Sequence, residues 1–176
     1  MNHEEHDDYE DYEDDDYEDD GEGLSDRDAD LADVREQVAQ LTDGLQTLTL
    51  TGDDGVVPAI PDGAAGCGAV VAEFCWSRLK REEQDGFLAK LRKAAGKDAL
   101  LVLLDDVYVE GTSNPVARTD AQGTTYEVVT TDEGQRIERP KSYPTDSALR
   151  KRLANAAKEI RIARWEYFWV LTCRLK

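Results

Sequence analysis

The side chains that most often act as general bases are scarce in the globular part of this sequence. The two histidines, His3 and His6, both lie near the N-terminus. A histidine base or a Ser-His-Asp triad within a folded core is therefore excluded. Any chemistry in the core must therefore do without imidazole.

Neither the cysteines nor the acidic residues show the spacing of a metal site. Cys67, Cys75 and Cys173 are odd in number and lack metal-ligand spacing, which favours free thiols in a reducing compartment. His3 and His6 with their acidic neighbours could bind cations loosely, but the regular spacing of a calcium loop is absent. We therefore predict no metal cofactor. A cytoplasmic location is expected, because acids occupy the N-terminus where a signal peptide needs basic and apolar residues.

Acidic residues are concentrated at one end of the chain, whose net charge is −18. Residues 1–33 contain 18 acids and a single base, whereas the remainder has 21 acids and 20 bases. So polar a segment cannot bury enough apolar surface to offset its ordering entropy. We predict a disordered acidic tail over residues 1–24 and one folded domain over 25–176. The acidity argues against direct binding to nucleic acid or to an anionic membrane, and it favours a basic protein as the tail's partner, although most such runs only aid solubility.

Hydrophobic periodicity divides the rest of the chain into helices and strands. The strongest signals are the apolar runs Ala69–Cys75 and Ala99–Asp106, which are typical of strands buried on both faces of a parallel sheet. The helical segment between them implies a right-handed crossover. The predicted helices cover 28–42, 80–95 and 146–158, and the predicted strands cover 45–50, 69–75, 99–106, 124–130, 136–139, 160–165 and 167–175.

The last four predicted strands form two antiparallel pairs. The runs 124–130 and 136–139 flank Asp132-Glu133-Gly134, which predicts an exposed hairpin inserted between a strand and a helix. The runs 160–165 and 167–175 are separated by a very short turn and predict a hairpin at the sheet edge.

Three segments carry a more specific pattern. Ile60-Pro61-Asp62-Gly63 precedes Ala69-Val70-Val71-Ala72, and Phe74-Cys75-Trp76-Ser77 follows; Leu104–Gly111 ends the next strand, and Trp165–Trp169 lies in the last hairpin. With the order of elements, these segments resemble the fourth strand, the fifth strand and the closing hairpin of class I S-adenosylmethionine-dependent methyltransferases. The resemblance runs from about Gln46 to Lys176. It implies an α/β fold: a truncated Rossmann-like methyltransferase sheet, mostly parallel with an antiparallel C-terminal hairpin and flanked by helices, with S-adenosylmethionine as cofactor.

The resemblance also implies where a cofactor would be bound. Asp53 and Asp54 follow a strand where the family places its adenine-side contacts, and Glu73, Phe74 and Trp76 lie at the mouth of the fourth-strand equivalent. For each position a structural role is the alternative: a solvated turn for the two aspartates and core packing for Trp76.

A substrate pocket is implied beyond the next strand. Tyr108, Glu110 and Arg118 would line it, unless Glu110 and Arg118 only form a surface pair. Methyl transfer needs no imidazole, because the sulfonium is already an activated leaving group and catalysis is largely positioning, with an occasional carboxylate or tyrosine base. Under the resemblance, Glu73 or Tyr108 would be the candidate base.

The family's glycine-rich cofactor turn is not found. Gly63, Gly66 and Gly68 precede a predicted strand, whereas the family's glycines follow one. The family's central first strand is also missing, which would expose one edge of the 69–75 strand. Either the 45–50 strand pairs with that edge, or a homo-oligomer or another protein partner completes the sheet.

Three functional hypotheses follow. The leading one is a degenerate or partial methyltransferase-like protein that is inactive alone and acts as a subunit or needs a partner. The first alternative is an active methyltransferase that is completed by another chain or truncated by a gene-start error. The second alternative is an interaction module whose acidic tail binds a basic protein.

Overall fold

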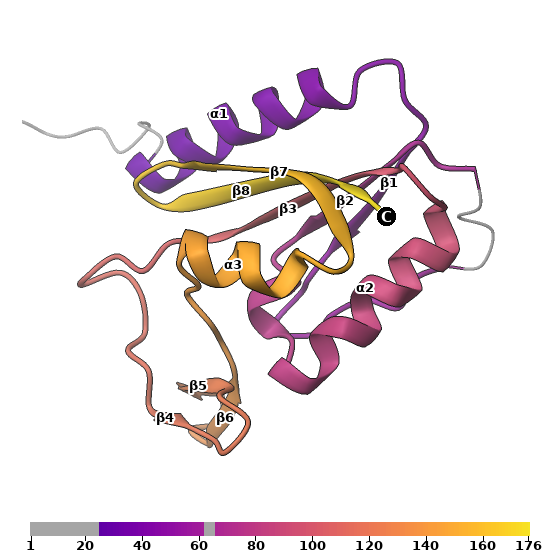
Figure 1. The fold of residues 1–176 in the computed structure, drawn as a ribbon. Coiled ribbons are helices and arrows are strands. Elements are labelled where there is room, and N and C mark those ends of the chain that lie inside the picture. The colour runs from indigo at the N-terminus through magenta and orange to yellow at the C-terminus, as the bar shows by residue number, and fades with distance from the viewer. Residues whose placement is uncertain (1–24, 62–65) are drawn as a thin grey trace, which may run out of the picture.

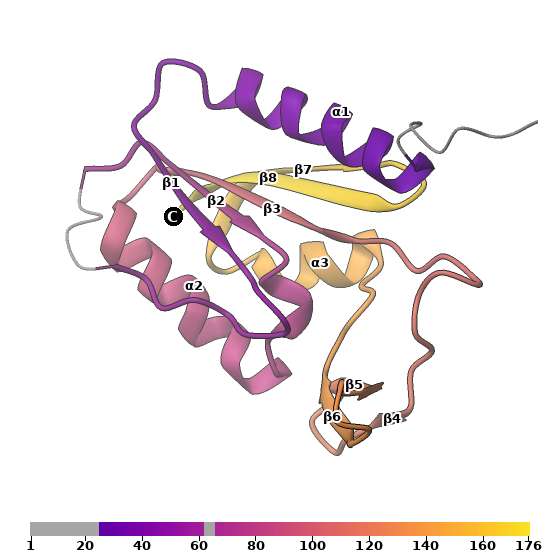
Figure 2. The same ribbon diagram turned by 180° about the vertical axis from the view of Figure 1, so that it is seen from behind.

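The fold has three layers, with a sheet between helices. The computed structural model describes residues 25–61 and 66–176, so the predicted tail over residues 1–24 lies outside the described residues. Helix α1 (Asp26–Leu41) covers one face of the sheet, whereas α2 (Arg81–Ala95) and α3 (Asp146–Leu153) cover the other (Figures 1 and 2). Among the described residues, no helix is long and apolar enough to cross a membrane.

The main sheet contains five strands in the order β1-β2-β3-β8-β7. The first three, β1 (Thr47–Thr51), β2 (Ala69–Glu73) and β3 (Leu100–Asp106), are mutually parallel. Strand β8 (Phe168–Leu175) runs antiparallel between β3 and β7 (Ala157–Arg164). The predicted α/β fold, mostly parallel with an antiparallel C-terminal hairpin, is confirmed.

The central strands are held by packing on both of their faces. All five residues of β2 and the first six of β3 are buried. Because side chains alternate along a strand, Ala69 and Val71 pack toward α1, while Val70 and Ala72 pack toward α2 and α3. The continuous apolar runs in the sequence therefore reflect a sheet covered on both sides.

Strand β1 pairs with the edge of β2 that the sequence left open. The pairing is parallel, with Leu48 opposite Val70 and Leu50 opposite Ala72. Of the two arrangements predicted for this edge, the one within the same chain is present. In the described part of the chain, β1 is in turn the outer strand of the sheet.

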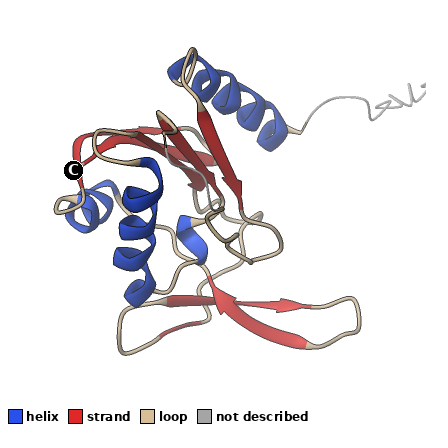
Figure 3. Ribbon diagram, turned by 90° about the vertical axis from the view of Figure 1, so that its right-hand side faces the viewer, coloured by secondary structure: helices blue, strands red, loops and turns tan. Residues whose placement is uncertain are grey.

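The insertion between β3 and α3 forms a second, three-stranded sheet (Figure 3). It consists of β4 (Arg118–Thr119), β5 (Thr125–Thr130) and β6 (Arg136–Pro140). The predicted hairpin is present, but the prediction that it is exposed is wrong for β5. Tyr126 and Glu127 are buried, because the inner end of the insertion packs near the short 3₁₀ helix η1 (Trp76–Arg78) that follows β2.

The third helix is shorter than the sequence predicts. It ends at Leu153, and the predicted helical residues Ala157 and Lys158 already belong to β7. Leu149, Leu153 and Ala157 are all buried and are spaced by four, so the spacing is helical although a turn separates the last two. The other predicted helices and strands are present with ends shifted by a few residues.

Candidate functional site

The carboxyl ends of the three parallel strands meet at one edge of the sheet, where open α/β sheets bind ligands. The turn after β1 begins at Gly52, η1 follows β2, and β3 ends at Asp105 and Asp106. Phe74, at the exit of β2, has a φ of 56°, a left-handed conformation that is uncommon for residues other than glycine.

A buried cluster of charges joins this edge to the insertion. The Asp105 carboxylate is fully buried and accepts hydrogen bonds of 2.8 Å from the Ser77 N–H and from the Ser77 hydroxyl. The Lys141 Nζ lies 2.6 Å from Asp106 Oδ2 and 3.5 Å from Asp105 Oδ1. Burial raises the pKa of Asp105, and the neighbouring ammonium of Lys141 opposes that rise. Arg27 NH2 also lies 2.7 Å from Asp106 Oδ1, so Asp106 has two cations, whereas Asp105 is compensated by Lys141.

A second charge network lies nearby, around Glu127. Its carboxylate Oε1 is 2.6 Å from Arg78 NH1 and 2.8 Å from Arg139 Nε. Although burial raises the pKa of Glu127, the hydrogen bonds from the two arginines lower it below its ordinary value. Arg139 also pairs with Asp54 at 3.0 Å, so the network links the insertion to the turn after β1.

Two cavities open beside Asp106. A polar cavity of about 160 Å³ lies between α1, η1 and the insertion, lined by Arg27, Arg78 and Tyr167 among others. A larger cavity of about 350 Å³ is lined by Tyr108 and Arg164 among others.

The structure places the two predicted adenine-side residues in a closed turn. Asp53 and Val56 exchange backbone hydrogen bonds of 3.1 and 2.8 Å. The Asp54 side chain is 92% exposed apart from its pair with Arg139. These positions match the solvated-turn alternative in geometry, and their role as ligand contacts stays a prediction.

The three residues at the β2 exit are divided between the two faces of the sheet. Glu73 accepts hydrogen bonds of 3.3 Å from both Arg35 and Thr51 on the α1 side. Phe74 packs edge-on against Phe168, with ring centroids 6.1 Å apart. Trp76 is only 2% exposed and belongs to the core on the α2 side. The structure therefore brings Glu73 and Phe74 to one face and Trp76 to the other.

The predicted substrate residues do not form one group. The Tyr108 hydroxyl donates to Glu110 at 3.1 Å, and Tyr108 lines the larger cavity beside Asp106. Arg118 pairs with Glu138 at 2.6 Å and stacks on Tyr126, within the insertion. The surface pair proposed for Glu110 and Arg118 is therefore replaced by two separate pairs.

The thiols do not supply a nucleophile. Cys67, Cys75 and Cys173 are buried free cysteines, and burial raises the pKa of both Cys75 and Cys173 to about 12. Since the thiolate is the reactive form, these two side chains act as small apolar core residues.

Sequence reasoning missed the residues that build the charge clusters. Ser77 stands beside the Trp76 that the sequence did single out, and Asp105 and Asp106 end the strongest predicted strand. Two charged residues ending a buried strand were a usable signal. No such sequence signal marks Lys141 or Arg27, because their shared partner Asp106 lies 35 and 79 residues away along the chain, respectively.

Comparison with known proteins relates this geometry to known structures. No protein-family model matches the sequence, and no curated protein sequence matches it. Among solved structures, a DhpI–SAH complex superposes with a TM-score of 0.50 at 16% identity, covering 66% of this chain and 50% of that chain. The chain has a class I S-adenosylmethionine-dependent methyltransferase-like fold.

Other methyltransferases align over a similar range. The glycopeptide N-methyltransferase MtfA with S-adenosyl-L-homocysteine gives a TM-score of 0.45 at 14% identity, covering 71% of this chain and 60% of that one. In the DhpI comparison, this chain spans about half the length of the DhpI chain. The methyltransferase-like fold is shared, and the site must be argued from the residues present.

We expect the Lys141→Met variant to lose about 3–5 kcal/mol of folding free energy, because the change leaves the fully buried Asp105 carboxylate without its cation, whereas Asp106 keeps its pair with Arg27. Urea denaturation at neutral pH measures the loss. Lys158→Met is the matched control, since Lys158 forms an exposed ion pair of 2.6 Å with Asp98. Equal losses in the two variants would show that the buried ion pair contributes no more to folding stability than the exposed one.

We expect Glu127→Gln to destabilise the fold by roughly 1–3 kcal/mol at neutral pH, because both arginines lose a charged acceptor. The pKa of Glu127 is lower in the folded than in the unfolded state, so the unfolded state binds more protons between the two values. The advantage of the wild type is therefore complete above pH 4.5, the ordinary value, and shrinks as the pH falls toward the folded-state pKa.

The measurement is the free energy of unfolding in urea at several pH values. Glu138→Gln serves as the control, because Glu138 pairs with Arg118 at an exposed position. A difference between wild type and Glu127→Gln that grows on acidification would contradict the expectation.

Proposed function

We propose that this chain is a methyltransferase-like protein that does not hold S-adenosylmethionine by itself and acts as a non-catalytic or partner-completed subunit. The proposal rests mainly on the turn after β1, where the N–H groups of Gly52, Asp53 and Val56 donate to carbonyls within the chain. DhpI and MtfA are solved with SAM or SAH, so the cofactor to test is S-adenosylmethionine.

The exits of β1 and β2 pack directly against each other. The Gly52 N–H donates to the Glu73 carbonyl at 2.8 Å. A Cβ at position 52 would lie 2.2 Å from the Phe74 carbonyl oxygen, a distance that no side chain tolerates. Gly52 is therefore required for the close approach of the two backbones, and its N–H is engaged within the chain.

Two further N–H groups of the turn are also engaged within the chain. The N–H groups of Asp53 and Val56 bond each other's carbonyls, so they do not point toward a ligand as a phosphate- or carboxylate-binding turn requires. The Glu73 carboxylate is held by Arg35 and Thr51. These contacts leave S-adenosylmethionine few free groups at the turn after β1 and at Glu73, and we assign the chain no step of methyl transfer.

Isothermal titration with S-adenosylmethionine tests this proposal. We expect no saturable heat from the isolated chain, because binding would have to break the hydrogen bonds of the turn. An active class I methyltransferase titrated in the same buffer is the positive control. Micromolar affinity of the isolated chain would overturn the proposal, and loss of that affinity in Glu73→Gln would then locate the site.

The alternative of an enzyme completed by a second chain is favoured by one observation. Strand β1 is the outer strand of the described sheet, and Thr47, Thr49 and Thr51 are exposed along it. An unpaired edge of this kind accepts a further strand.

A second copy of the chain is the partner to test first. If it completes the sheet, light scattering should show a mass that rises with concentration, and Thr49→Lys should remain monomeric because a charged edge resists pairing. Gln122→Lys adds the same charge at an exposed site in the insertion and should behave as wild type. A monomer at all concentrations would exclude self-completion.

A further inference from the structure

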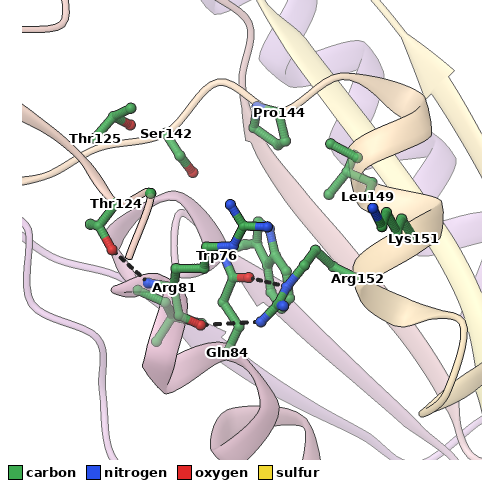
Figure 4. A pocket seen from close by; sticks show the side chains of 13 residues that line it. Trp76, Arg81, Gln84, Thr124, Thr125, Ser142, Pro144, Leu149, Lys151 and Arg152 are labelled. Carbon is green, nitrogen blue, oxygen red and sulfur yellow. Dashed lines mark hydrogen bonds between the residues drawn. The ribbon is translucent and has the colours of Figure 1, made fainter. Parts of the chain in front are cut away.

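A separate cleft lies on the α2 and α3 side of the sheet (Figure 4). It has a volume of about 360 Å³ and is bounded by η1, the start of α2, the insertion and α3. This volume is in the range of small-molecule sites. The cleft does not include Asp53, Asp54 or Glu73, so what it binds is independent of the function proposed above.

The charge of the cleft is opposite to that of the chain. Arg81, Lys151 and Arg152 line it, and none of the thirteen described lining residues is acidic, whereas the whole chain has a net charge of −18. Two carboxylates lie nearby: Asp85, 3.6 Å from Arg152 and 79% exposed, and Glu82, which is exposed and accepts from the Thr124 hydroxyl at 3.5 Å. Solvent screens both of them. The cleft therefore presents an excess of positive charge.

The cationic side chains are positioned before any ligand binds. Arg152 donates from Nε to Gln84 at 2.8 Å and from NH2 to the Arg81 carbonyl at 3.2 Å. The Arg81 N–H in turn donates to the Thr124 hydroxyl at 2.8 Å, as the dashed lines in Figure 4 show. A guanidinium has five N–H donors, more than these contacts use. Arg152 is thus oriented with donors left for an anion.

Gly123 lies beside the Arg81 guanidinium and has a φ of 91°, a backbone conformation that favours glycine. A Cβ on Gly123 would lie 2.6 Å from Arg81 NH1, so the glycine leaves room for the guanidinium at the cleft wall. The insertion and the helix are therefore fitted to each other around this arginine.

One hydroxyl in the cleft lacks a partner. The Ser142 Oγ is buried and makes no hydrogen bond within the described part of the chain, although the Ser142 N–H is fixed by a 3.0 Å bond to the Ser77 carbonyl. A buried polar atom without a partner costs free energy. An oxygen atom of a ligand would remove this cost.

Part of the cleft lining is apolar. It is formed by Trp76, Leu79, Pro144 and Leu149, which can cover a flat or branched hydrocarbon group. We propose that this cleft binds a small organic anion, with a carboxylate or phosphate facing Arg81, Lys151 and Arg152 and an apolar group against Trp76.

Titration of the full chain with phenyl phosphate, benzoate and benzyl alcohol tests the proposal by ¹⁵N NMR. At least one of the two anions should shift the amides of Thr124, Thr125 and Ser142 saturably, and the stronger of the two identifies the acid group. Benzyl alcohol should bind at least about tenfold more weakly, because it lacks the charge-assisted hydrogen bonds. Absence of saturable shifts with both anions, or equal binding of the alcohol, would overturn the proposal.

Variants separate the cleft from general charge effects. Lys151→Gln and Arg152→Gln should each weaken anion binding about tenfold, and Lys151 is exposed, so its replacement is not expected to disturb folding. Arg150→Gln is the matched control on the same helix, since Arg150 donates to the Ile160 carbonyl and does not line the cleft. Equal weakening by Arg150→Gln would refute a specific site.

Ser142→Ala supplies a second readout. The substitution should weaken binding of the anion, yet it should leave the thermal stability of the free protein unchanged or higher, because an unpartnered hydroxyl is removed. A loss of stability without a change in affinity would show that Ser142 has only a structural role.

Discussion

The pairing of Lys141 with Asp105 and Asp106 is the interaction on which the arrangement of the functional edge depends. Asp105 is fully buried at the end of β3, where an uncompensated carboxylate would be strongly unfavourable. Lys141 supplies the cation from the segment between β6 and α3, and Ser77 supplies two hydrogen bonds from η1. These contacts hold together β3, η1 and the segment between β6 and α3. The same segments contribute walls of the cavities and of the cationic cleft.

The same edge accounts for a methyltransferase-like sheet in a chain that, as we propose, does not hold the nucleotide by itself. Strands β2 and β3 form the apolar centre of the sheet. Helices cover this centre on both faces, so its packing does not depend on which strand occupies the outer position. The outer position is taken by β1, and Gly52 allows its backbone to approach the exit of β2. A glycine after a strand is thus used for contact between backbones, whereas binding a nucleotide would need the same amides to be free.

Much of the architecture could be predicted from local patterns. The apolar runs at β2 and β3 and the helical periodicity of α1 and α2 report burial directly, so their positions were predicted within a few residues. The prediction failed for α3, because Ala157 continues the spacing of Leu149 and Leu153 although it begins a strand. It failed also for the exposure of β5, because the covering surface comes from η1, about 50 residues earlier in the chain.

The sequence by itself determined the layers of the fold, the order of its elements and the separation of an acidic end from a nearly neutral domain, since these depend on composition and on neighbours a few residues apart. Only the tertiary structure decided that β1 pairs with β2, that Glu73 is held by Arg35, and that three cations gather around Trp76 without an acid among them. The physical reason is that charge compensation and cavity walls are set by distances in space. Residues such as Lys141 and Arg152 carry no mark of their partners in the surrounding sequence.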